Sequence, residues 1–124
     1  MALKTEGNRP GDVLLFEEGD HYSREEVTIA AGADLKVGAV LGKVTASGKY
    51  ILRAPAAVDG SQVAAAVLLQ DADAAAADVA NVIVVARHAR VKRAALVHDA
   101  TVDNAAKRQT AVDELAGIGI LTDV

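Results

Sequence analysis

The chain has 124 residues, of which 52% are hydrophobic and 24% are charged, and its formal net charge is −4. This length and composition fit one domain with a packed core and argue against a disordered chain. The acidic balance gives no electrostatic footprint for nucleic acid, and the lack of cysteine excludes disulfides and thiolate chemistry.

The hydrophobic fraction is dominated by small side chains. Aromatic residues make up only 2% of the chain, namely Phe16, Tyr22 and Tyr50. Because alanine buries little area, the core has to rely on valine, leucine and isoleucine, and a monomer would have a thin core. An interface between copies would bury further apolar area, which stabilises by about 25 cal/mol per Å². The composition therefore favours self-association.

The N-terminal segment combines polar residues with a short apolar patch. We expect a flexible arm over residues 1–20, followed by a β-rich domain over residues 21–124. The apolar patch in the arm consists of Val13, Leu14, Leu15 and Phe16. It is either the first strand of the domain's own sheet or a strand supplied to a partner by β-augmentation, and the sequence leaves both open. No signal peptide is expected here, because residues 1–12 contain no apolar h-region.

Short β-type runs alternate with glycine turns in the middle of the chain. Strands are predicted over residues 26–29, 39–45 and 50–52, and Ser47-Gly48-Lys49 predicts a tight hairpin between the last two. The run 63–69 is apolar throughout, which predicts burial on both faces or cover from a neighbouring subunit. The longest charge-free run is far shorter than the roughly 18 apolar residues of a membrane-spanning helix.

The second half of the chain continues as β structure and is predicted to end with a helix and a closing strand. A polar connection over residues 70–80 precedes the strongest strand signal, 81–85, and the alternation over 86–91 predicts an edge strand with one solvated face. Residues 101–116 have helical character, with Asp103 as the N-cap. A closing strand is predicted over residues 118–121.

No group of residues carries a recognisable reaction. The segment from Gly38 to Val44 is one residue short of a phosphate loop, and Val44 replaces the hydroxyl that would hold magnesium. The histidines are scattered and come without cysteine, which argues against zinc; they are His21, His88 and His98.

Two charged groups are best explained as solvated surface. The aspartates Asp71, Asp73 and Asp78 invite a calcium interpretation, but the loop lacks the glycine and distal glutamate of an EF-hand. The basic residues Arg87, Arg90, Lys92 and Arg93 have no interleaved aromatic residue, and a solvated strand edge is favoured over a phosphate site.

Three blocks of sequence together resemble the phage head decoration proteins, the family typified by the lambda decoration protein. They are GDVLLFEE (11–18) followed by YSREEVTI (22–29), LKVGAVLGKV (35–44) followed by SGKY (47–50), and DGSQVAAAVLL (59–69) followed by the strand 82–85 and the helix with Lys107-Arg108. Their order and spacing cover nearly the whole chain. Each block alone is weakly specific.

The resemblance implies a mostly β fold, with a bent β-ribbon or partly open barrel (β-clip-like), a short C-terminal helix and a flexible N-terminal arm. It also implies a homotrimer on the outer surface of the capsid in the virion, at three-fold and quasi-three-fold positions, made in the host cytoplasm. There it would stabilise the expanded head against the pressure of packaged DNA. The partner would be the major capsid protein, contacted by Val13, Leu14, Leu15 and Phe16.

These expectations describe a structural protein and not an enzyme. No catalytic residue, cofactor or metal is expected, and neither nucleic acid nor a membrane is expected as a partner. The alternative is a lipoyl- or biotinyl-like carrier domain with Lys49 as the modified residue, because Lys49 sits at a hairpin tip. A small enzyme with a β-clip fold is a weaker alternative, since no acid and base are paired at a workable spacing.

Overall fold

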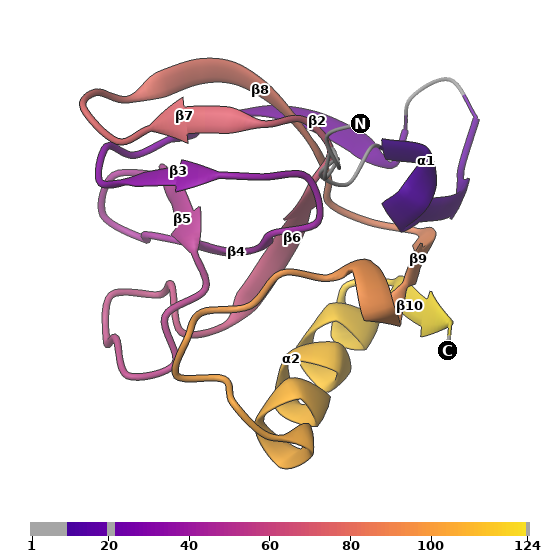
Figure 1. Ribbon diagram of the computed structural model, residues 1–124. Coiled ribbons are helices and arrows are strands. Elements are labelled where there is room, and N and C mark those ends of the chain that lie inside the picture. Colours follow the sequence, from indigo (N-terminus) through magenta and orange to yellow (C-terminus); the bar gives the residue numbers. More distant parts are fainter. Residues whose placement is uncertain (1–9, 20–21, 124) are drawn as a thin grey trace, which may run out of the picture.

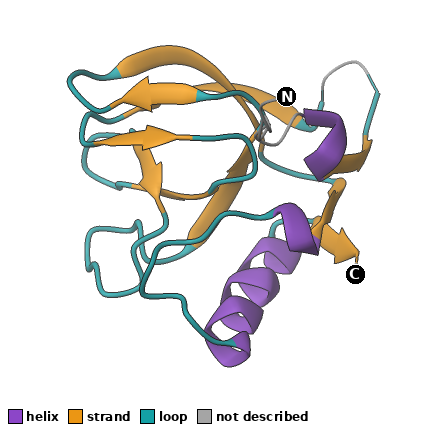
Figure 2. Ribbon diagram, in the orientation of Figure 1, coloured by secondary structure: helices purple, strands orange, loops and turns teal. Residues whose placement is uncertain are grey.

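The computed structural model describes residues 10–19 and 22–123 of the chain (Figure 1). It is mostly β, and one longer helix packs against the strands (Figure 2). The predicted fold class is confirmed. Within these residues no helix is long and apolar enough to cross a bilayer.

Five strands curl into a barrel. They are β2 (Arg24–Ile29), β4 (Val40–Lys43), β5 (Tyr50–Leu52), β6 (Ala64–Leu68) and β8 (Val79–Val85). Their hydrogen-bonded order is β2-β5-β4-β6-β8, and β8 pairs back onto β2. The β2–β5 junction is the only parallel one and has a single registered pair, Ile29 with Tyr50. The barrel is therefore weakly joined along that seam, in agreement with the predicted partly open barrel.

The predicted hairpin is the β4–β5 pair, in which Leu41 lies opposite Leu52 and Lys43 opposite Tyr50. Gly48 has a φ of +72°, which the turn requires and which glycine adopts without steric cost. The hairpin prediction is thus confirmed.

Two hydrophobic cores share the barrel strands. Alternate residues face opposite sides, so on β4 Leu41 points into the barrel core while Val40 joins a second core outside the barrel. On β6, Leu68 and Val67 divide in the same way. The apolar run 63–69 is accordingly buried on both faces over most of its length, as predicted.

A two-stranded sheet covers part of the barrel core. Strand β3 (Ala33–Leu35) pairs antiparallel with β7 (Ala72–Ala74). Their buried side chains, Leu35, Ala72 and Ala74, join the barrel core. The polar connection predicted over residues 70–80 therefore contains a short strand, which its alanines and aspartates did not indicate.

A three-stranded sheet, here called the terminal sheet, assembles from three distant segments. Helix α1 (Pro10–Val13) leads into β1 (Leu14–Glu17), which pairs antiparallel with β9 (Ala89–Lys92). Strand β10 (Ile120–Asp123) pairs parallel with the other side of β9. The edge-strand prediction for residues 86–91 is wrong, because β9 is the central strand. Its solvated face is as predicted, since Arg90 and Lys92 are exposed.

The predicted division into an arm of residues 1–20 and a domain of residues 21–124 stays a prediction. Residues 1–9, 20 and 21, with His21 among them, lie outside the described part. Residues 10–19 are folded against β9, and Val13 is fully buried in the second core.

Helix α2 (Ala105–Gly117) follows the short 3₁₀ helix η1 (Arg93–Ala95) and a loop. Its N-cap is Asn104 and not Asp103, because the Asn104 side chain accepts a hydrogen bond from the Lys107 N–H at 3.0 Å. The buried residues Ala111, Val112 and Leu115 lie in its second half. Residues 105–110 are exposed on every side.

Gly42 lies where β4 passes against the loop that leads into β6. A Cβ at this position would meet the backbone of Ser61, 2.7 Å from its carbonyl carbon. Ser61 is fully buried, so neither backbone can move away easily. The contact holds the loop against the barrel.

We expect Gly42→Ala to lower the free energy of unfolding by about 3 kcal/mol, because the added methyl group overpacks two backbones. The matched control is Gly117→Ala, which meets no atom within 4 Å. Gly117 lies at the end of α2, where alanine is a better helix former, so no loss is expected. Urea unfolding followed by circular dichroism measures both variants, and equal stabilities would contradict the proposed close contact.

Candidate interaction surface

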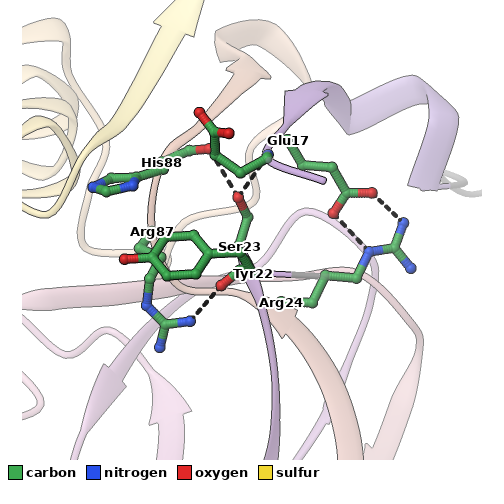
Figure 3. A network of polar contacts seen from close by, with 7 residues as sticks. Glu17, Tyr22, Ser23, Arg24, Arg87 and His88 are labelled. Carbon is green, nitrogen blue, oxygen red and sulfur yellow. Dashed lines mark hydrogen bonds and ion pairs between the residues drawn. The ribbon is translucent and has the colours of Figure 1, made fainter. Parts of the chain in front are cut away.

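A buried serine joins the terminal sheet to the barrel. Ser23 is 0% exposed, and its Oγ accepts a hydrogen bond from the Glu18 N–H and donates one to the His88 carbonyl, both at 2.9 Å. Figure 3 shows the Ser23 side chain directed toward His88. The segment after β1 is thereby tied to the turn before β9.

An ion pair fixes the end of β1 to the start of β2. The Arg24 guanidinium donates from Nε and Nη2 to the two carboxylate oxygens of Glu17, at 2.7 and 2.8 Å. The hydrogen bond to Glu17 raises the pKa of Arg24, and partial burial opposes this shift. The two-point geometry fixes orientation better than a single contact does. Solvent screens the pair, so we assign it a role in positioning β1.

Three side chains lie together beside this junction. The Tyr22 and His88 ring centroids are 5.3 Å apart, and the Arg87 guanidinium carbon lies 5.5 Å from the Tyr22 ring centroid. Arg87 also donates to the Tyr22 carbonyl and to Glu25, both at 2.6 Å. Figure 3 shows Tyr22 between Arg87 and His88. Tyr22 is held at the surface with 53% of its area exposed.

The four residues predicted to contact the capsid do not share one environment. Val13 is fully buried and Leu14 half-buried, whereas Leu15 and Phe16 are 50% and 54% exposed. Strict alternation would turn one of two consecutive side chains inward. The register between β1 and β9 shifts between Leu14 and Phe16, and this β-bulge leaves both Leu15 and Phe16 in solvent.

The bulge places both side chains on the outer face of the terminal sheet. Phe16 and Leu121 are registered with Arg90 from its two sides, so the three share one face. Leu121 is 44% exposed, and a shallow hollow of about 180 Å³ lies between Phe16 and Leu121. We define the outer face by Leu15, Phe16, Arg90, Lys92 and Leu121.

Most basic residues of the predicted charged edge are held by internal contacts. Arg90 forms an ion pair with Asp123 on β10, and Arg93 donates from Nε to the Thr122 hydroxyl at 3.0 Å. With Arg87 bound to Glu25, three of the four basic residues from the predicted charged edge have partners within the chain. The face is thus apolar on β1 and β10 and cationic along β9.

The polar residues that were considered as candidate sites have structural partners. In residues 10–19 and 22–123, no three histidine, aspartate or glutamate side chains are grouped so that they could hold a metal ion. The aspartates considered for calcium cap turns, because Asp71 accepts from the Val37 N–H and Asp73 from the Ala75 N–H. Lys49, the alternative modification site, is ion-paired with Asp78 at 2.5 Å.

Sequence patterns pointed to only part of this surface. Leu15 and Phe16 were found because they form an apolar patch after a polar segment. Tyr22, His88 and Leu121 were not considered as contact residues. The rarity of aromatic residues is a signal that could have found Tyr22: two of the three aromatic side chains, Phe16 and Tyr22, are more than half exposed.

A family model described as bacteriophage lambda head decoration protein D matches residues 3–120. No curated protein matches the chain.

We expect Ser23→Ala to lower the free energy of unfolding by about 2 kcal/mol, because the Glu18 N–H and the His88 carbonyl lose their shared partner. The control is Ser47→Ala, whose exposed Oγ accepts a single hydrogen bond from the Lys49 N–H. That change should cost less than about 0.5 kcal/mol, as is usual for surface sites. Chemical denaturation of both variants provides the comparison, and a Ser23→Ala protein as stable as the control would refute the role assigned to Ser23.

Proposed function

Because the chain belongs to the family of the bacteriophage lambda head decoration protein D, it decorates a phage head, and we propose that the outer face of the terminal sheet binds the shell. The family match covers residues 3–120 and so includes β1, β9 and the start of β10. Membership in this family places the protein on the capsid of the virion. The family is one of structural proteins and not a class of enzymes.

The observation that carries the proposal is the exposure of Leu15 and Phe16 on an edge strand. Strand β1 is the outermost member of the terminal sheet, so one of its backbone edges faces away from β9. An edge of this kind can add a strand from a partner through main-chain hydrogen bonds, while exposed side chains give specificity. Val13 and Leu14 then serve the contact indirectly, since their burial holds β1 in place.

The proposed partner is the major capsid protein on the outside of the expanded head. Full burial of a large apolar side chain contributes about 1.5–3 kcal/mol, and half-exposed residues such as Leu15 and Phe16 contribute proportionally less. One copy would therefore bind weakly through these two side chains. A homotrimer at three-fold and quasi-three-fold positions would engage several capsid subunits at once, so that modest contacts combine through effective concentration.

Such a trimer would stabilise the head without any chemical step. By linking neighbouring capsid subunits, it would resist the outward pressure of packaged DNA. The terminal sheet suits this role, because Ser23 and the Glu17–Arg24 pair tie β1 rigidly to the barrel. Load on β1 would pass into the barrel and not into a loose segment.

We expect the double substitution Leu15→Ser with Phe16→Ser to abolish attachment to expanded, emptied heads, with the fold preserved because both side chains are already exposed. The loss of binding should be at least about 10-fold, since removing about 1.4 kcal/mol of contact energy already gives that factor. Co-sedimentation of purified protein with heads of the phage that encodes it measures the effect.

The matched control is Leu15→Met with Phe16→Leu, which keeps apolar side chains of similar size at both positions. This variant should attach nearly as well as the unmodified protein, and neither protein should attach to procapsids. Undiminished attachment of the serine variant would exclude the outer face as the capsid contact.

A further inference from the structure

A second group of exposed apolar side chains lies away from the outer face. The loop between β5 and β6 carries Val58, which is 96% exposed, beside the exposed residues Pro55 and Ala56. We call Pro55, Ala56 and Val58 the knob. In Figure 1 this loop lies at the lower left, whereas β1 and β10 lie at the right. The knob therefore does not belong to the surface proposed to bind the capsid.

The knob is held by a well-connected loop. Ser61 at its base is fully buried and donates from its hydroxyl and its N–H to the Asp59 carboxylate, at 2.5 and 3.0 Å. The Asp59 carbonyl accepts from the Thr45 N–H at 2.9 Å. Gly60 has a φ of +105° and lies against Thr45, which leaves no room for a side chain. An exposed valine in a loop fixed at so many points is presented in one position.

Helix α2 beside the knob is only half packed. Residues 105–110 are exposed on every side, although Asn104 caps the helix. Helices in proteins gain most of their stability from packing one face, and this half packs none within the protomer. A shallow hollow that includes Pro55 and Gln62 lies between the knob loop and Lys107, Thr110 and Glu114 of the helix.

A larger hollow lies on the other flank of the same helix. Its volume is about 720 Å³, and its apolar walls are formed by Ala94, Leu96, Ala100, Val102 and Val112. The polar side chains that also line it are Arg93, His98, Asp99, Asp103 and Arg108. Burial lowers the pKa of His98, and Arg108 adds to this shift, which favours the neutral imidazole.

We propose that in the homotrimer the knob of each protomer seats in this hollow of the next, with residues 105–110 of α2 covered between them. This inference rests on the proposed trimer and names its interface. One chain carries both features, a projecting knob and a recess with apolar side chains in its walls. Contacts between unlike patches close into a ring when the rotation fits, and a ring of three copies gives the proposed trimer.

Charge supports the same arrangement. Asp59 follows Val58 directly, and its carboxylate is bound to Ser61 at the loop base. Arg108 stands at the hollow, and within the described residues it makes no ion pair, because the neighbouring Asp103 is bound by Lys107. Seating Val58 in the hollow would bring Asp59 of one protomer toward Arg108 of the next.

Engineered disulfides test the contact directly, because the chain has no cysteine. The double variant Val58→Cys with Ala100→Cys should form covalent trimers on oxidation, visible on a non-reducing denaturing gel. A disulfide requires Cα atoms within about 7 Å, so cross-linking reports real proximity. The control, Val58→Cys with Ala76→Cys, places the second cysteine on the exposed β7–β8 connection and should give no covalent trimer.

A polar substitution gives an independent measurement. Val58→Ser should raise the concentration at which the trimer dissociates by about 10-fold, since the apolar contact of the valine with Leu96, Val102 and Val112 would be lost. Sedimentation velocity measures assembly, and circular dichroism confirms that the exposed site leaves the fold intact. The control Ala76→Ser introduces the same residue at another exposed position and should leave the trimer unchanged.

The outcomes separate this inference from the proposed capsid contact. Trimers that dissociate at an unchanged concentration in Val58→Ser and resist cross-linking through Val58 and Ala100 would overturn the knob contact, while head binding through Leu15 and Phe16 would stand. Loss of head binding in the serine variant of Leu15 and Phe16, with trimers intact, supports both assignments. An unmodified protein that stays monomeric at the concentrations at which it binds heads would overturn this inference and the trimer, but not the capsid contact.

Discussion

The structure depends on three strands whose two faces are both buried. On β4, β6 and β8, alternate side chains enter the barrel core and the second core, as Leu41 and Val40 do on β4. The chain supplies mostly small and branched side chains, so neither core is large. Two thin cores that share their walls stabilise each other, because loosening a shared strand exposes apolar area on both sides. The terminal sheet and α2 are attached through the second core, which places the outer face relative to the barrel.

The local elements of this fold could be predicted from sequence, but their long-range pairing could not. Glycine-containing turns indicated the β4–β5 hairpin, and an apolar run indicated that both faces of β6 are buried. Hydrophobic periodicity indicated α2, although its N-cap lies one residue later than predicted, because Asn104 and Asp103 are equally suitable caps. The terminal sheet joins residues 14–17, 89–92 and 120–123. No local pattern shows that β9 receives a strand on each side, so β9 was taken for an edge.

Only part of the candidate site could be predicted from the sequence, for a similar reason. A polar segment followed by an apolar patch indicated Val13 to Phe16, and it left open whether the patch belongs to the chain's own sheet. The structure pairs it with β9 and buries Val13, yet leaves Leu15 and Phe16 exposed. The bulge behind this division has no sequence signature here, since no glycine marks it. Leu121 became part of the face only through its register with Arg90.

The β-bulge in β1 also affects how readily the protein polymerises. A long, straight and apolar edge strand would allow copies of the protein to pair edge to edge into fibres. At β1 the regular hydrogen-bonding ladder is interrupted after Leu14, so the backbone groups of a second strand cannot pair with it in continuous register. A partner shaped to the irregularity can still dock, whereas a straight strand of unrelated sequence cannot follow it. The same distortion that bares two apolar side chains thus protects a concentrated solution of the protein from runaway aggregation.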